Sequence, residues 1–134
     1  MELQLRHIEL QHDYPTLDAM WKAWKFPSPP IEALPDTGLI VTNFRGDPIA
    51  AGFLYKTNST LAWMEWIVAS MFCTKAERAT GLDMLIEHLE AWAHVEGFTT
   101  LFTCSKNASY SHKLKKLEWI PTDTGMNHFI RRLG

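Results

Sequence analysis

The sequence predicts a mixed α/β (α+β) fold around a central, mostly antiparallel sheet that contains some parallel pairing, with the element order β-α-β-β-β-α-β-α-β-β. Three observations carry this prediction. Residues 38–70 form three strand-like, mostly apolar runs separated by turn residues, which is typical of an antiparallel meander. Residues 76–96 place apolar side chains at helical spacing. The length of 134 residues predicts a single domain over 1–134.

The first third of the chain predicts a strand, a helix and a loop. Residues 3–8 alternate apolar and polar side chains, as in a strand. Asp13 is a good N-cap for a helix over 13–25, with Pro15 at a permitted early position. The prolines of 26–35 cannot continue this helix, because they lack an amide hydrogen and restrict the residue before them.

The middle of the chain predicts the three strands of the meander and the longest helix. The expected strands are 39–44, 49–55 and 60–70, with turns at 45–48 and 56–59. The helix is expected over 76–96, with an apolar face made by Leu82, Leu85, Ile86, Leu89 and Ala93. Gly97 ends this helix.

The last third of the chain predicts four shorter elements. They are a strand at 99–104, a helix at 107–117, and strands near 119–122 and 126–132. No internal repeat and no interdomain linker interrupts the series.

Composition excludes several classes of protein. A net charge of −2 and the absence of a basic stripe argue against nucleic acid as the main partner. Cys73 and Cys104 lie in no metal-binding or disulfide pattern, so no metal site is expected. No apolar stretch reaches the roughly 20 residues of a membrane helix, and the N-terminus does not resemble a signal peptide. We therefore expect a cytoplasmic protein without a membrane partner, and the six tryptophans leave homodimerisation open.

Two stretches carry a resemblance to a known family. The first is Trp66-Ile67-Val68-Ala69-Ser70 followed by Arg78-Ala79-Thr80-Gly81-Leu82-Asp83, and the second is Asn107 with Leu117-Glu118-Trp119. With the order of elements, they resemble the GNAT superfamily of acyl-CoA-dependent N-acetyltransferases over nearly the whole chain. In that family the first stretch is a strand followed by (Q/R)xxGx(G/A), and the second is an Asn followed by Leu-Gly-Phe.

The resemblance implies acetyl-CoA as co-substrate. A helix N-terminus offers amides and a positive dipole end to a pyrophosphate, which the family binds at its signature. The implied pyrophosphate contacts are Arg78, Ala79, Thr80 and Gly81, and the implied pantetheine contacts are Val68, Ala69, Ser70 and Asn107. Asp83 departs from the usual Gly or Ala, and the connection 71–77 is longer than usual. An ordinary solvated helix start is the alternative interpretation of Arg78.

Catalysis would need a base for the attacking amine and an acid for the leaving thiolate. Glu65 is the one polar side chain within 61–69, and strand periodicity places it on the same face as Trp63 and Ile67. Burial there would disfavour its ionised form and make it a useful base, a role that several family members give to a Glu on this strand. Projection into solvent or an ion pair is the alternative.

The family's usual acid, a Tyr, is replaced by Leu114, so Tyr110 and His112 are the nearest substitutes. A packed Tyr110 and a solvated His112 are the alternative. The acceptor site would be formed by Trp21, Trp24, Phe26 and His128, although Trp21 also suits the core and His128 also suits the surface.

The predicted function is transfer of an acetyl group from acetyl-CoA to an amine of a small molecule or protein by direct attack. The alternative is a catalytically degenerate GNAT-fold protein that serves as a binding or interaction module. The acceptor amine, the acyl length, the general acid and the oligomeric state do not follow from the sequence.

Overall fold

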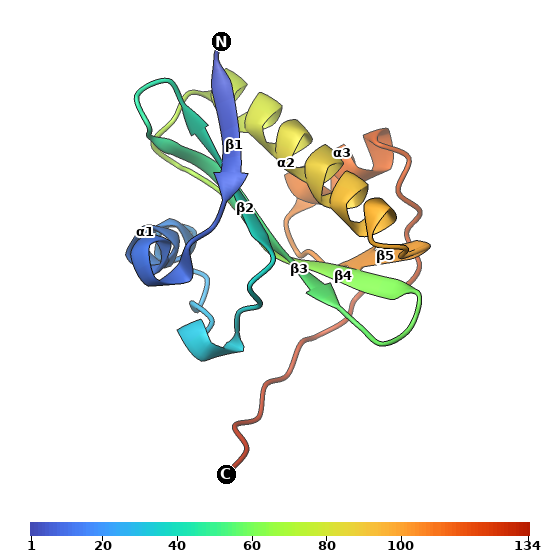
Figure 1. Ribbon diagram of the computed structural model, residues 1–134. Coiled ribbons are helices and arrows are strands. Elements are labelled where there is room, and N and C mark those ends of the chain that lie inside the picture. Colours follow the sequence, from blue (N-terminus) through green and yellow to red (C-terminus); the bar gives the residue numbers. More distant parts are fainter. The chain divides into compact units, whose positions relative to one another are not determined.

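The computed structural model describes all residues, 1–134 (Figure 1). They divide into two compact units, Met1–Cys104 and Ser105–Gly134. The first unit holds one five-stranded sheet in the order β1-β2-β3-β4-β5. Its elements are β1 (Leu3–His7), α1 (Leu10–Ala23), the 3₁₀ turn η1 (Ile31–Ala33), β2 (Gly38–Asn43), β3 (Pro48–Lys56), β4 (Leu61–Ala69), α2 (Lys75–Val95) and β5 (Thr100–Thr103). The second unit holds α3 (Ala108–Lys116).

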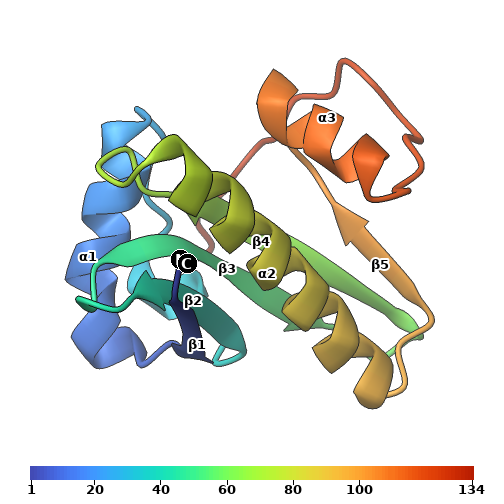
Figure 2. The same ribbon diagram turned by 90° about the horizontal axis from the view of Figure 1, so that it is seen from above.

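The sheet is antiparallel from β1 to β4, and β5 pairs with β4 in parallel. The predicted mixed, mostly antiparallel sheet is therefore confirmed, and its strands lie within a few residues of the predicted ranges. The alternating side chains of β2 and β3 divide between the two faces of the sheet. Ile40, Ala51 and Phe53 pack with residues of α1. Val41, Ile49 and Gly52 lie on the opposite face, against α2 (Figure 2).

Helix α1 begins three residues earlier than predicted. Glu9 occupies the N-cap position, and Asp13 lies inside the first turns, where its carboxylate accepts a 2.8 Å hydrogen bond from the Glu9 amide. The same carboxylate receives Arg6 Nη1 and Nη2 at 2.8 and 2.9 Å. Asp13 thus stabilises the helix start from within and ties it to β1, which is why a strong capping residue is found away from the cap.

The proline-rich loop after α1 is held at two points. Tyr14 donates a 2.6 Å hydrogen bond to the Pro29 carbonyl, and Tyr55 donates a 2.8 Å bond to the Ala33 carbonyl. The loop is therefore attached to both α1 and β3, and it returns the chain to the sheet at Gly38. A side chain at Gly38 would meet the Phe53 ring at 2.7 Å, so a glycine is required at this close approach.

All three helices end in the same hydrogen-bonded motif. After α2, Gly97 has φ +93°, its amide donates to the His94 carbonyl, and the Phe98 amide donates to the Ala93 carbonyl. This 5→2 and 6→1 pair is the Schellman arrangement. Lys25 takes the equivalent left-handed position after α1 with φ +61°.

Glu118 takes that position after α3, with φ +69°. The Glu118 amide donates to the Lys115 carbonyl, and the Trp119 amide donates to the Leu114 carbonyl. Glu118, which stands where the resembled motif Leu-Gly-Phe has its glycine, therefore completes the same motif that Gly97 completes after α2. The glutamate adopts the glycine-like conformation because the two hydrogen bonds satisfy the last carbonyls.

The predicted strands at 119–122 and 126–132 are wrong, because residues 119–134 form no strand. A strand forms only beside a partner that completes its hydrogen bonds, and alternation along a short segment carries no information about a partner. The observed order of strands and α-helices is therefore β-α-β-β-β-α-β-α. No helix of the structure combines the length and the apolar character that crossing a membrane requires.

Candidate active site where β4 separates from β5

Strands β4 and β5 separate part of the way along β4. Their parallel register runs from Leu61↔Thr100 to Met64↔Thr103 and stops there. Strand β4 continues to Ala69 with β3 on one side, so the opposite edge of its last five residues has no neighbouring strand. This open edge of β4 is the candidate site.

A β-bulge lies at the point of separation. Glu65 pairs with Phe53 and Val68 pairs with Ala51, so Trp66 and Ile67 together oppose Gly52. Trp66 has φ +60°, a conformation that is rare for a large side chain and that persists only when the surroundings hold it. Residues in such strained conformations concentrate at functional sites, so the bulge marks this part of β4 as a candidate functional site.

Four contacts hold Trp66 in this conformation. Its amide donates to Glu65 Oε1 at 3.3 Å, and its carbonyl accepts from Trp21 Nε1 at 3.3 Å. Its indole nitrogen donates to the Tyr55 hydroxyl at 2.8 Å, and its ring packs against the Trp21 ring at 70°. The bulge is therefore fixed from α1, β3 and β4 at once.

The open edge presents backbone groups of two residues. The Ser70 amide donates to the Ile49 carbonyl across to β3. Because the directions of backbone groups alternate along a strand, Ile67 and Ala69 present their amides and carbonyls to the opposite edge. The Ala69 carbonyl accepts a 2.7 Å hydrogen bond from Trp24 Nε1. Of the predicted pantetheine contacts, Ala69 thus lies on the open edge. Val68 directs its backbone groups toward β3, and Ser70 directs its amide to β3 and its carbonyl to Arg78 Nε.

Glu65 lies directly before the bulge and is half-buried. Its Oε2 accepts from Trp63 Nε1 at 2.8 Å, and its Oε1 accepts from the Trp66 amide. The prediction that Glu65 and Trp63 share a face is therefore confirmed. Ile67 is on the other face, because its Cδ1 lies beside Gly52 together with Leu85 and Leu89 of α2, and the extra residue of the bulge inverts the alternation.

The charge of Glu65 acts on two neighbouring groups. Burial, opposed by the Trp66 hydrogen bond and reinforced by the Glu65 charge, raises the pKa of Tyr55. Burial, and then the Glu65 charge, raises the pKa of the Cys104 thiol. A thiol with a raised pKa is a poor nucleophile at neutral pH, so Cys104 does not suit covalent catalysis.

The predicted acceptor residues of α1 and the following loop have different environments. Trp21 is 1% exposed and belongs to the core between α1 and the sheet, so it forms no wall of an open site. Trp24 is half-buried, with its indole on the β4 edge. Phe26 is 42% exposed. An acceptor site above the bulge would therefore use Trp24 and Phe26.

The predicted pyrophosphate residues lie inside α2. The helix begins at Lys75 with Thr74 as N-cap, so Arg78 is its fourth residue and Ala79, Thr80 and Gly81 lie deeper. The Arg78 amide donates to the Thr74 carbonyl, and Arg78 Nε donates to the Ser70 carbonyl at 3.0 Å. A Cβ at Gly81 would lie 2.5 Å from Ile49 Cγ2. Gly81 therefore lets α2 pack closely on β3.

Two backbone amides at the start of α2 are hydrogen-bonded by side chains of the same segment. Thr74 Oγ1 accepts from the Glu77 amide at 3.0 Å, and Glu77 Oε1 accepts from the Thr74 amide at 3.0 Å, which is a capping box. Glu77 Oε2 also accepts from Asn43 Nδ2 at 3.2 Å. This role of Glu77 is absent from the predicted site, although the spacing Thr-x-x-Glu is a sufficient signal for it.

The remaining predicted residues belong to the second unit. Asn107 is the N-cap of α3, where its Oδ1 accepts from the Tyr110 amide at 2.9 Å. Tyr110 and His112 lie in the first turns of α3, and His112 is exposed. His128 is exposed in the segment that forms no strand. Their roles toward a ligand stay predictions.

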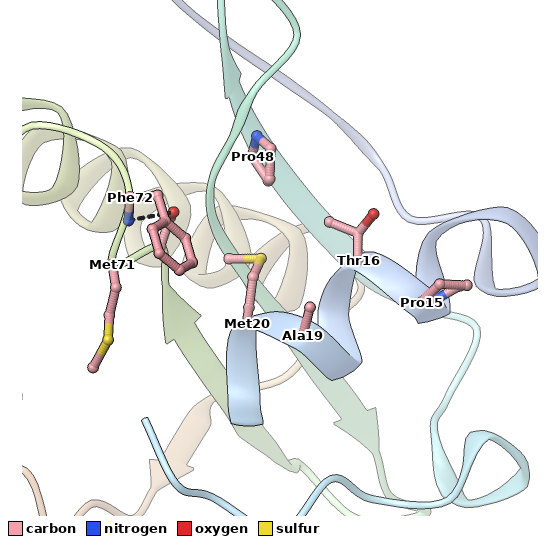
Figure 3. Close-up of a pocket in the computed structure, with 8 residues that line it drawn as sticks. Pro15, Thr16, Ala19, Met20, Pro48, Met71 and Phe72 are labelled. Atoms are coloured by element: carbon pink, nitrogen blue, oxygen red, sulfur yellow. Dashed lines mark hydrogen bonds between the residues drawn. The ribbon is translucent and has the colours of Figure 1, made fainter. Parts of the chain in front are cut away.

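Two shallow pockets lie at the far end of β4. The larger, about 440 Å³, is bounded by α1, the start of β3 and the 70–72 segment (Figure 3). Its lining is mostly apolar, and Phe72 beside it is 90% exposed. The smaller, about 310 Å³, includes Asp47 and Glu77. Neither pocket contains Glu65, and no cluster of His, Cys, Asp or Glu side chains could hold a metal ion.

The fold is similar to that of solved acetyltransferases. Glucosamine-6-phosphate N-acetyltransferase from Arabidopsis thaliana matches with a TM-score of 0.71 and 10% identity, over 98% of this chain and all of that one. An acetyltransferase from Trypanosoma brucei matches at 0.67 and 15% identity, over 96% of this chain and all of that one.

N-acetylglutamate synthase from Neisseria gonorrhoeae, solved with coenzyme A and N-acetyl-glutamate, matches at 0.69 and 15% identity. That match covers 86% of this chain and 28% of the synthase. No protein-family model and no curated protein sequence matches this chain.

Proposed function

We propose that this chain, which has the GNAT fold, moves an acetyl group from acetyl-CoA to an amine of a small molecule or protein by direct attack of the amine. The observation that carries the proposal is the open edge of β4 beside a fixed bulge, with Glu65 next to it. The fold of the solved acetyltransferases supports it, and one of those neighbours was solved with coenzyme A.

The open edge fits the pantetheine arm of the co-substrate. That arm is an extended chain with two amide groups, and an extended amide chain adds to a strand edge through backbone hydrogen bonds. Ile67 supplies an amide and a carbonyl on this edge, and Ala69 supplies an amide, while its carbonyl already accepts from Trp24 Nε1. Bound there, the arm would place its thioester, which supplies the acetyl group, beside the bulge.

Glu65 is the proposed proton acceptor. An attacking amine must lose a proton as its bond to the acetyl carbon forms, and a carboxylate in reach, directly or through one water, accepts it. The two hydrogen bonds to Glu65 orient the carboxylate without blocking all of its acceptor positions. Tyr110 and His112 are kept as proposed donors toward the leaving thiolate, and Phe26, Trp24 and His128 as proposed acceptor contacts.

Replacement of Glu65 tests the catalytic part. We expect Glu65→Gln to lower kcat by about 100-fold or more, the usual size of a general-base contribution, while binding of acetyl-CoA persists. Glu87→Gln, an exposed glutamate on α2, is the matched control and should retain full turnover. The measurement is CoA-thiol release over a panel of amines, with the acetylated product identified by mass. Unchanged turnover in Glu65→Gln would remove the residue from this role.

A binding module without catalysis is the second candidate. The closure of α2 by Glu77 and the presence of Leu114 where the family has its acid favour it. Titration calorimetry with acetyl-CoA and with pantetheine separates the two functions. A protein that binds neither at millimolar concentration, and that releases no thiol, would leave the binding module as the function.

A further inference from the structure

We infer that the protein recognises its acyl donor through the pantetheine arm and gains little from the 3′-phospho-ADP end, so that acetyl-pantetheine serves about as well as acetyl-CoA. This inference rests on the proposed function. The inference goes beyond that function because it names the part of the donor to which the chain binds. The substrate class is therefore acyl-pantetheine thioesters, of which acetyl-CoA is one.

The first step concerns the amides at the start of α2. Anions bind at a helix N-terminus because its first amides lack partners within the helix. Here the Glu77 side chain accepts from the Thr74 amide, and the Thr74 side chain accepts from the Glu77 amide. The Arg78 amide is already within the helix, bonded to the Thr74 carbonyl. The Thr74, Glu77 and Arg78 amides are therefore taken. Only the Lys75 and Ala76 amides of the first turn are left for a diphosphate.

The second step concerns charge. Hydrogen bonds from the Thr74 backbone and from Asn43 lower the pKa of Glu77, so it is ionised at neutral pH. Its carboxylate occupies the positive end of the α2 dipole, where a diphosphate would otherwise be attracted. Asp47 and Arg45 line the same small pocket as Glu77, and Arg45 Nε donates to Asp47 Oδ2 at 3.1 Å. A diphosphate arriving here meets two carboxylates and one guanidinium that is already paired with Asp47, so the repulsion by Glu77 is not offset by a free cation of this pocket.

The third step concerns the two residues that the family signature assigns to the diphosphate. Arg78 Nε is engaged by the Ser70 carbonyl, which directs the guanidinium along the loop before the helix. The Cα of Gly81 faces Ile49 and Val41 of the sheet, so its lack of a side chain opens no approach for a ligand. Lys75 is exposed at the first helical position, where a single solvated charge adds little affinity.

The pantetheine half of the donor site is independent of these residues. Ile67 and Ala69 belong to β4, and the bulge is fixed by Trp21, Trp66 and Tyr55. Neither of these two hydrogen bonds involves α2, and α2 touches this part of the site only through the Ile67 side chain, which lies near Leu85 and Leu89. The part of the donor site that would bind the pantetheine arm is therefore present, whereas the part that would bind the diphosphate is occupied by the protein's own side chains.

The test compares acetyl-CoA, acetyl-dephospho-CoA and acetyl-pantetheine with the full-length chain. We expect their kcat/KM values to agree within about fivefold, which corresponds to about 1 kcal/mol. Calorimetric Kd values for CoA and pantetheine should agree to the same degree. A value for CoA more than about 100-fold better than for pantetheine would overturn the inference and leave the proposed function intact. Absence of binding by all three would overturn both.

A charge variant gives a second, independent readout. Glu77→Gln keeps a residue suited to the capping box but removes the carboxylate charge. We expect it to bind CoA about three- to tenfold more tightly at low salt, with pantetheine binding unchanged, because a repulsion between exposed charges is of this size. Glu87→Gln is the matched control. Equal CoA affinity in Glu77→Gln and in the unchanged protein would contradict the repulsion on which the inference depends.

Discussion

Trp24 on α1 donates its indole hydrogen to the Ala69 carbonyl on β4 at 2.7 Å, forty-five positions further along the chain. Trp21, one helical turn earlier, makes the equivalent bond to the Trp66 carbonyl at 3.3 Å. Two tryptophans three residues apart on the helix therefore contact two carbonyls three residues apart on the strand. This match sets the position of α1 along β4 and places an indole on the open edge.

Removal of the Trp24 bond should have opposite effects on stability and on donor binding. Trp24→Phe loses one hydrogen bond, and we expect the free energy of unfolding to fall by about 0.5–1.5 kcal/mol. The same change leaves the Ala69 carbonyl open to the arm of the donor, so binding of pantetheine should be retained or improved by a few-fold. Urea unfolding and calorimetry measure the two effects. Phe26→Leu, at an exposed aromatic, is the control for loss of ring area.

Weakened pantetheine binding in Trp24→Phe, at a protein concentration where the variant is folded, would contradict this prediction. It would mean that the indole contributes to the donor site in place of competing with the arm for the Ala69 carbonyl.

Gly81 is predicted to matter for packing. Gly81→Ala would place a methyl group 2.5 Å from Ile49 Cγ2, and we expect a net loss of about 1 kcal/mol or more, because overpacking outweighs the better helix propensity of alanine. In the double variant Gly81→Ala/Ile49→Ala this clash disappears. The coupling energy from a double-mutant cycle in urea should therefore be favourable by about 1 kcal/mol. Unchanged stability but lost CoA affinity in Gly81→Ala would instead favour the diphosphate role.

The sequence predicted the sheet well because its strands are specified locally. Mostly apolar runs separated by Gly-Asp-Pro and Asn-Ser turns define β2, β3 and β4, and the helical period defines α2. The bulge at Trp66 could not be predicted, because 61–69 is one apolar run with Glu65 as its one polar residue, and no glycine or asparagine indicates a left-handed residue. The bulge arises from contacts with Trp21 and Tyr55, which are distant in the sequence.

The same distinction holds for the candidate site, where features that follow from a local pattern were predicted and features that depend on packing were not. Glu65 was identifiable as the polar residue of an apolar strand, and its neighbour Trp63 followed from periodicity. The interpretation of Gly81 came from a short motif, and a motif of this length does not distinguish a ligand contact from close packing of a helix on a sheet. The capping box of Glu77 was visible in the sequence and sets the true start of α2.

The left-handed residue after α3 offers a stabilising change. Glu118 has φ +69° and pays the steric cost of that conformation, which glycine avoids. We expect Glu118→Gly to raise the free energy of unfolding by about 0.5–1 kcal/mol, after the larger entropy of a glycine in the unfolded chain is subtracted. Glu118→Ala, which keeps a Cβ, is the control and should give no such gain. Equal stability of the two variants would contradict the strain at this position.

The ion pair between Arg6 and Asp13 predicts how stability depends on pH. Asp13 is 3% exposed, and the Arg6 hydrogen bonds, opposed by burial and aided by the Glu9 amide, lower the pKa of its carboxyl. The unfolded state then binds this proton more readily than the folded state, so stability rises with pH in the window between the two pKa values. The contribution is complete above the unfolded pKa of about 3.9 and is lost as pH falls through the lower folded value.

Asp13→Asn isolates this contribution from the other acidic groups. We expect it to cost about 1.5–3 kcal/mol at pH 7, because bonds to a charged group are lost while Arg6, 47% exposed, remains solvated. The difference from the unchanged protein should shrink as the pH is lowered below about 4, since the aspartate itself then becomes protonated. Urea unfolding at pH 7, 5, 4 and 3 measures it. A difference in the free energy of unfolding that stays constant over this range would show that Asp13 contributes through the packing of its side chain and not through its charge.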